Sequence, residues 1–359
     1  MPQHTERTID QGKAEAFMGK MVSFLNGASM GFMLSIGHRT GLFDTLAQLP
    51  PATSEAIAQA AGLNERYVRE WLGAVVTGGI VDYDPAAHTY RLPPEHAGAL
   101  TRAAGPNNLA RIAQQFAIFG SVEGKLVDCF RHGGGVAYAE YPGFQAFVSE
   151  VTGPIFDASL IERTLPLITG LIDRLKAGID VADVGCGAGH ALNLMAGAFP
   201  NSHFVGYDFS ADGIALARAE AQARGRLNVR FEVKDVATLD GTVQFDLITV
   251  FDAIHDQVYP ARVLKGICDS LKTGGTFLCV DVATSSHLQE NLGHPLAPFF
   301  YSTSTMHCMT VSLAAHGEGL GTAWGEQKAL EMLAAAGFKD VEVTRVEGDI
   351  LNNYYIARK

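Results

Sequence analysis

A glycine-rich turn near the middle of the chain is the first place where chemistry can be expected. The apolar segment Val181–Val184 contains Asp183, and Gly185, Gly187 and Gly189 follow it at alternate positions. Glycines let a strand turn sharply into a helix and let a ligand approach the backbone closely. Their spacing differs from the GxGxxG spacing of dinucleotide binders. The acid before the first glycine favours a ligand with an ammonium group and a carboxylate, as in S-adenosylmethionine (SAM).

Two further acids follow the next two strand-like segments. Asp208 lies about 20 residues past the glycines, where an acid can accept hydrogen bonds from both hydroxyls of a ribose, and Phe209 can pack on the adenine face. Asp235, beside Val236, can accept from the adenine amino group. Two alternatives stay open: Asp208 as a helix cap before Gly213, and Asp235 as part of a surface turn.

A histidine and an aspartate, His255 and Asp256, follow the apolar segment Phe245–Val250. Ligands bind beyond the carboxyl ends of parallel strands, and an imidazole can take a proton near neutral pH. Methyl transfer from a sulfonium is an in-line displacement, and a hydroxyl acceptor must lose a proton. One well-placed base could therefore carry the reaction. The alternative is a histidine that caps or fills this loop.

Aromatic side chains are frequent in the segments that could surround an acceptor. A small, partly hydrophobic or aromatic acceptor is therefore expected, and oxygen, nitrogen and sulfur acceptors are not separated by these residues. His307 is followed by Cys308, but without further ligands at useful spacing we expect no metal site. The side chains expected to line the acceptor pocket are Phe116, Phe119, Tyr138, Tyr141, Phe299, Phe300, Tyr301 and His307.

The first 100 residues have the pattern of a winged helix. Ser54–Ala61 reads as a helix that Gly62 closes, and Asn64 can cap the next helix. Two short strand-like segments, 80–83 and 89–92, flank a turn and make a wing. Three parts are expected: a winged-helix domain over 1–100, a helical linker and active-site cover over 101–160, and a cofactor-binding domain over 161–359.

From residue 181 onward, strand-like and helix-like segments alternate, which predicts a doubly wound α/β sheet. The last two strand-like segments, 341–346 and 354–357, are joined by a connection too short for a parallel crossover. We therefore expect this pair to be antiparallel.

The turn at 183–189, Asp208 and Asp235, in this order, resemble the class I SAM-dependent methyltransferases over roughly residues 160–359. The resemblance implies a Rossmann-like seven-stranded sheet with an antiparallel last strand, and SAM as the cofactor. It also implies that Phe251 approaches the methionine part of SAM. The ending Asn352–Tyr355 is similar to that of a bacterial subgroup often labelled as transcriptional regulators because of its winged helix.

The stretch Ile254-His255-Asp256 resembles the His-Asp pair of small-molecule O-methyltransferases. In that family the histidine is the general base, and an N-terminal winged-helix domain forms the dimer. The apolar region Phe17–Ile36 is consistent with such a homodimer. The chain departs from the family at Gln257, where tryptophan is usual, and the acid that orients the histidine is not evident; Glu318 is one choice.

Two other functions remain as alternatives: a SAM-responsive winged-helix regulator that binds DNA, and a SAM-binding scaffold without activity. The net charge is −11, and residues 1–100 hold seven Lys and Arg against ten Asp and Glu. A groove reader needs a basic face to neutralise phosphates, so no nucleic acid partner is expected. Five scattered cysteines, no signal-like start and no long apolar run favour a cytoplasmic protein without a membrane partner.

Overall fold

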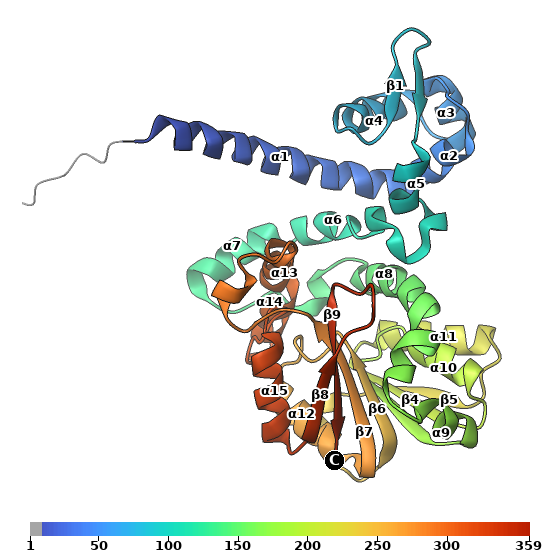
Figure 1. Ribbon diagram of the computed structural model, residues 1–359, viewed down its shortest axis with the longest axis vertical. Coiled ribbons are helices and arrows are strands. Elements are labelled where there is room, and N and C mark those ends of the chain that lie inside the picture. Colours follow the sequence, from blue (N-terminus) through green and yellow to red (C-terminus); the bar gives the residue numbers. More distant parts are fainter. Residues whose placement is uncertain (1–8) are drawn as a thin grey trace, which may run out of the picture. The chain divides into compact units, whose positions relative to one another are not determined.

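The computed structural model describes residues 9–359 and divides after Ala117 into two compact units (Figure 1). Each unit has its own apolar core and is described by itself. The division passes through the segment 101–160, for which the sequence predicts a linker and an active-site cover. Among the described residues, no helix combines the length and the apolar character that a bilayer crossing requires.

The first unit is the winged-helix arrangement that the sequence predicts. Asn64 caps α4 by accepting a hydrogen bond from the Arg66 backbone N–H at 3.1 Å, and Gly62 ends α3 in the left-handed conformation. The elements are α1 (Gln11–Thr40), α2 (Leu42–Gln48), α3 (Ser54–Ala61), α4 (Glu65–Thr77), β1 (Asp82–Asp84), β2 (Thr89–Arg91), α5 (Pro94–Leu100), two short 3-10 helices (Arg102–Asn107 and Leu109–Arg111) and the start of α6 (Gln114–Gly120).

Helix α1 packs against α2 and α4 through aromatic side chains. The rings of Phe43 and Trp71 meet edge to face at 5.2 Å, and Trp71 Nε1 donates to the Met33 carbonyl at 2.9 Å. A Cβ at Gly37 would lie 2.5 Å from Phe43, so only glycine fits there. The other half of α1 leaves large apolar side chains exposed: Phe17, Met18, Val22, Phe24 and Leu25.

The second unit is built on a seven-stranded sheet of order β5-β4-β3-β6-β7-β9-β8. Strands β3 to β7 run parallel, whereas β9 pairs antiparallel with both β7 and β8. The prediction of an antiparallel pair at the end of the chain is confirmed. The strands are β3 (Asp180–Val184), β4 (His203–Asp208), β5 (Val229–Val233), β6 (Phe245–Phe251), β7 (Leu271–Val282), β8 (Lys339–Thr344) and β9 (Asn352–Arg358).

Helices cover both faces of this sheet. Successive side chains of its strands point to opposite faces, and since both sets are apolar, both faces must be buried. Val181 packs in one core with α9, α10 and α11, whereas the next residue, Ala182, packs in the other core with α12 and α15. The helices are α7 (Glu123–His132), α8 (Phe144–Ser159), α9 (Leu171–Ala177), α10 (His190–Ala198), α11 (Ala211–Ala223), α12 (Pro260–Asp269), α13 (Ala297–Thr303), α14 (Met309–Ala314) and α15 (Gly325–Ala336).

Short helical turns connect several of these elements. Two of them are π-helical, Leu160–Thr164 and Ser304–Cys308, and the second joins α13 to α14. The 3-10 turns are Tyr138–Glu140, Leu165–Leu167, Val236–Thr238 and Leu288–Asn291.

Candidate active site

The glycine turn is bound to the neighbouring strand at the carboxyl edge of the sheet. The backbone N–H groups of Gly185 and Cys186 both donate to the Tyr207 carbonyl, at 2.8 and 3.0 Å. Gly185, Gly187 and Gly189 all have positive φ. A Cβ at Gly189 would lie 2.5 Å from a carbon of Phe231. The turn therefore needs glycine for its backbone angles and for its close approach to the sheet.

Two buried carboxyl groups, Asp183 and Asp208, flank this turn. Asp208 ends β4 and accepts from the backbone N–H groups of Gly187 at 2.9 Å and Ser210 at 2.8 Å. Asp183 accepts from the Thr249 hydroxyl at 2.6 Å. Burial raises the pKa of Asp183 to about 7, against the effect of the Thr249 hydrogen bond, and the nearby Asp208 raises it further. Burial also raises the pKa of Asp208, although its two backbone hydrogen bonds act in the opposite direction.

The other predicted cofactor residues lie along the same sheet edge. Phe209 is 58% exposed, and its ring meets Tyr138 edge to face at 5.1 Å. Asp235 accepts from the Ala237 backbone at 2.9 Å and so caps a 3-10 turn in which Val236 is buried. A surface turn is the alternative that the sequence left open for Asp235, and the contact of Asp235 with adenine stays a prediction. Phe251, at the end of β6, packs on Phe156 with ring centroids 5.0 Å apart.

An aromatic cluster surrounds His307 and includes three of the side chains predicted to line the acceptor pocket. The centroid of the His307 ring lies 4.8 Å from that of Tyr141, 5.6 Å from that of Tyr138 and 6.1 Å from that of Phe119. It stacks most closely on Phe144, at 3.9 Å, which the sequence reasoning did not single out. Burial lowers the pKa of His307 to about 4, so this imidazole is neutral at physiological pH.

Four other predicted pocket residues are not part of this cluster. Phe116 belongs to the first unit, where its ring lies against Gly31. Tyr301 accepts a hydrogen bond from Asn291 at 3.1 Å, and Phe299 packs on Phe300. Their contact with an acceptor stays a prediction.

His255 lies in the loop after β6, and the neighbouring strand β7 supplies its partner. His255 Nδ1 lies 2.6 Å from Asp281 Oδ1, and the two side chains are 5% and 1% exposed. The same oxygen accepts from the Val282 backbone at 2.8 Å and from Trp324 Nε1 at 3.1 Å. These contacts fix the plane of the imidazole, so that Nε2 is the nitrogen left for other chemistry.

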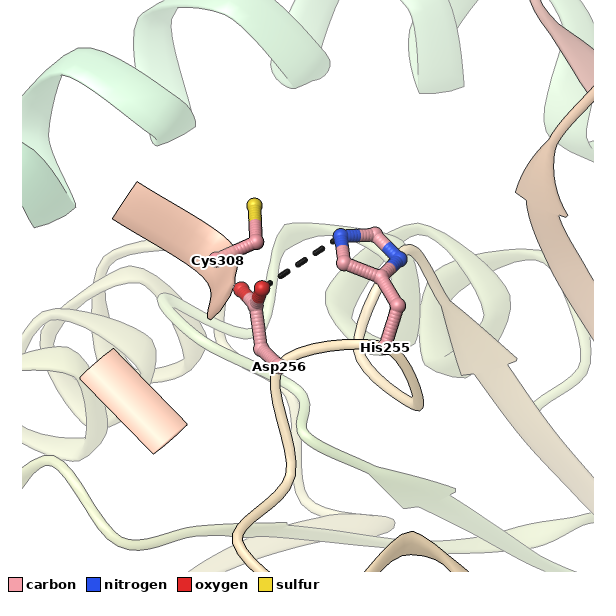
Figure 2. Close-up of side chains that lie close together, drawn as sticks. All are labelled: His255, Asp256 and Cys308. Atoms are coloured by element: carbon pink, nitrogen blue, oxygen red, sulfur yellow. Dashed lines mark ion pairs between the residues drawn. The ribbon is translucent and has the colours of Figure 1, made fainter. Parts of the chain in front are cut away.

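The free edge of His255 faces Asp256 and Cys308 (Figure 2). Nε2 lies 3.4 Å from Asp256 Oδ1, and Cys308 comes from the π-helical turn after α13. Burial lowers the pKa of His255, but the carboxylates of Asp281 and Asp256 outweigh it and raise that pKa well above its ordinary value. This arrangement therefore favours the protonated form of His255.

The sequence reasoning missed Asp281, the acid that orients His255. The side chain of Glu318, which the sequence left as one choice, is exposed, and its backbone N–H donates to the Val258 carbonyl. A signal for Asp281 was present: it is the only carboxylate in the apolar run 276–282, which ends at the same sheet edge as His255.

Comparison with known proteins identifies both parts of the chain. Residues 28–102 match the family model of the Rv2258c-like winged HTH domain, and residues 175–337 match that of a methyltransferase domain. The chain carries a winged-helix domain followed by a methyltransferase domain. The trans-aconitate 2-methyltransferase of Methylobacterium nodulans is 33% identical over 132 residues, which are 36% of this chain and 47% of that protein. The matched stretches span less than half the length of the first curated relatives.

Solved structures of methyltransferases share the fold over nearly the whole chain. Human N-acetylserotonin methyltransferase in complex with SAM has a TM-score of 0.68 at 17% identity, with 99% of both chains covered. The mitomycin 7-O-methyltransferase MmcR has a TM-score of 0.69 at 17% identity, with 98% of this chain and 100% of that chain covered. The chain therefore shares its fold with these two methyltransferase structures.

Proposed function

We propose that the protein transfers a methyl group from SAM to a small, partly hydrophobic or aromatic acceptor, with His255 as the general base. The cofactor is S-adenosylmethionine, for which the glycine turn between Asp183 and Asp208 is shaped. When bound, SAM supplies an electrophilic methyl group. The observation that carries the proposal is the 2.6 Å contact between His255 Nδ1 and Asp281, which presents Nε2 at the sheet edge where the cofactor binds.

Each group at this edge has a separate task. Asp183 suits the ammonium of SAM, and Asp208 suits its ribose. The N–H groups of Gly185, Cys186 and Gly187 hold the turn itself in place. The aromatic cluster around His307 positions the acceptor and excludes water. His255 Nε2 takes the proton of an acceptor hydroxyl as the oxygen attacks the methyl group, and Asp281 stabilises the imidazolium that forms.

The raised pKa of His255 has a direct consequence for the rate. The two neighbouring carboxylates favour the protonated form of His255, and a protonated imidazole cannot accept a second proton. The fraction of free base increases with pH up to that raised pKa. We therefore expect turnover of a hydroxyl acceptor to increase into the alkaline range.

A role in DNA binding has less support. The arginines of α4, the helix that would enter the groove, are paired with acids: Arg66 with Glu70, and Arg69 with Glu65 at 3.3 Å. In the wing, Arg91 pairs with Asp82 at 3.4 Å. Such pairing leaves little positive charge for phosphates.

Calorimetry and one substitution test the proposal. S-adenosylhomocysteine should bind with micromolar-range affinity, a magnitude common among enzyme ligands, and NAD should not bind. With a phenol that the wild type methylates, His255→Ala should lower turnover by about 10²–10⁴, the usual contribution of a positioned base. Affinity for S-adenosylhomocysteine should be retained. Equal losses of binding and turnover would mean that His255 only holds the loop, and binding without turnover of any acceptor would favour the scaffold.

A further inference from the structure

Three side chains of types that bind metals lie close together at His255, on the side of its ring that faces away from Asp281. The cluster consists of His255, Asp256 and Cys308, and one ligand atom from each lies within 4.8 Å of the other two. Figure 2 shows the three side chains converging, two from the loop after β6 and one from the π-helical turn. His255 and Cys308 are buried, whereas Asp256 is half-buried. Imidazole, carboxylate and thiolate together are the ligand set of zinc-class ions.

The contacts of Asp256 are not those of a satisfied carboxylate. Its Oδ1 is buried and, apart from the ion pair with His255, has no hydrogen-bond partner among residues 9–359. The separation from His255 Nε2 is 3.4 Å, which is long for a charge-assisted hydrogen bond. It is close to the spacing of about 3.3–3.8 Å between ligand atoms that bond lengths of about 2.0–2.3 Å give around a tetrahedral ion.

The second nitrogen of His255 supports the same interpretation. Histidines that bind metals almost always donate their other ring N–H to a carboxylate or carbonyl, which fixes the ring. Asp281 occupies that place at 2.6 Å and is itself held by Trp324 and the Val282 backbone. The histidine is therefore already oriented with Nε2 toward Asp256 and Cys308.

We propose that the His255–Asp256–Cys308 cluster binds one thiophilic divalent cation of the zinc class, with His255 Nε2, an Asp256 carboxylate oxygen and the Cys308 thiolate as ligands. Binding releases the Nε2 proton of His255 and the thiol proton of Cys308 to solvent. A contraction of about 1 Å brings the three atoms to tetrahedral spacing, and a fourth position remains open. Magnesium and calcium are disfavoured, because hard ions select oxygen ligands over a thiolate.

Such an ion would occupy the lone pair that a general base needs. A metal-bound His255 cannot accept a proton from the acceptor, so the bound cation would inhibit the base-catalysed reaction. This consequence rests on the proposed function, whereas binding of the cation does not. The test therefore measures binding, with neither SAM nor acceptor present.

The experiment titrates the full-length protein, first stripped by a chelator, with Co²⁺ as a spectroscopic probe for Zn²⁺. We expect one equivalent to bind, with the charge-transfer absorption of a thiolate ligand, and Zn²⁺ to displace it. Cys308→Ser should abolish the absorption. It should also weaken Co²⁺ binding by more than about 100-fold, because loss of a residue that only hydrogen-bonds a ligand already costs about 10–100-fold. Cys129→Ser, which removes another free thiol of the same unit, is the matched control and should behave as wild type.

Asp256→Asn serves as the second variant. Asp256 is half-buried, so this substitution should disturb folding less than a substitution of the buried Cys308. It should weaken Co²⁺ binding while the thiolate absorption persists at saturation. Thermal unfolding of each metal-free variant checks that it is folded. The proposal is overturned if the wild type binds no stoichiometric Co²⁺, if Cys308→Ser keeps the absorption, or if Cys129→Ser loses it. A protein that fails to methylate any acceptor yet binds Co²⁺ in this way would refute only the proposed function.

Discussion

The replacement Asp281→Asn tests how His255 is held. The two side chains are nearly fully buried and 2.6 Å apart, so the substitution removes one charge of a buried pair and keeps the shape of the side chain. Breaking a buried pair costs about 3–5 kcal/mol. One pKa unit corresponds to about 1.36 kcal/mol, so the pKa of His255 should fall by about two to four units. The asparagine carbonyl can still accept from Trp324 and the Val282 backbone, which favours the lower end.

The titration of His255 can be followed by NMR of its imidazole, without knowledge of the acceptor. In the wild type, in the presence of a chelator, His255 should titrate well above its ordinary value, and in Asp281→Asn much closer to it. Asp256→Asn is the control: its oxygen lies 3.4 Å away in a half-buried side chain, so the decrease should be smaller. At alkaline pH, where His255 is the free base in both proteins, Asp281→Asn should lower turnover of an acceptor phenol by about 10²–10³, because the imidazolium formed in the transition state loses its partner. An unchanged titration of His255 in Asp281→Asn would refute this reasoning.

Three further predictions concern the cofactor site and the first unit. Asp208→Ala should weaken binding of S-adenosylhomocysteine by about 10–100-fold, as expected for charge-assisted hydrogen bonds of about 1.5–3 kcal/mol; calorimetry checks this against Asp240→Ala, an exposed acid in a turn. Because the pKa of Asp183 is about 7 and SAM should bind its ionised form, the affinity for SAM should increase with pH up to about 7 and then level off, and Asp183→Asn should remove this dependence. Light scattering at micromolar concentration should give the mass of two chains, and Leu25→Glu on the exposed face of α1 should give one, whereas Leu227→Glu, 98% exposed in the other unit, should leave the dimer intact.

Much of the fold could be predicted because local signals and global topology agree. Ser54–Ala61 is a helix with the bounds that Gly62 and the preceding residues indicate. Each strand-like segment after residue 181 overlaps a strand, although β8 ends at Thr344 and not at residue 346. The antiparallel pair followed from the length of one connection. The extent of β7 could not be predicted in this way. β7 begins at Leu271, five residues before its apolar run 276–282, because Leu271 pairs with Phe245 on β6 across an irregular register.

The cofactor side of the site was more accessible to sequence reasoning than the acceptor side. Asp183, Gly185 and Asp208 belong to two adjacent parallel strands and to the turn that leaves the first of them, so strand order alone brings them together. The acceptor side combines the loop after β6 with segments around residues 138–144 and 304–308 that are far apart in the chain. No periodicity relates these segments, and Phe144 therefore could not be distinguished from any other apolar helix residue.

The π-helical turn at 304–308 explains why the sequence could not place Cys308 next to His255. A π-helix is a rare departure from the α-helical period, often found at functional sites, and it changes the direction of every side chain that follows. Here it joins α13 to α14 and carries two adjacent residues into different surroundings. His307 enters the aromatic cluster, where its imidazole is neutral, whereas Cys308 meets His255 and Asp256. One local irregularity thus supplies both a side chain of the proposed acceptor site, His307, and a side chain of the proposed metal cluster, Cys308. The sequence could not separate these two adjacent residues.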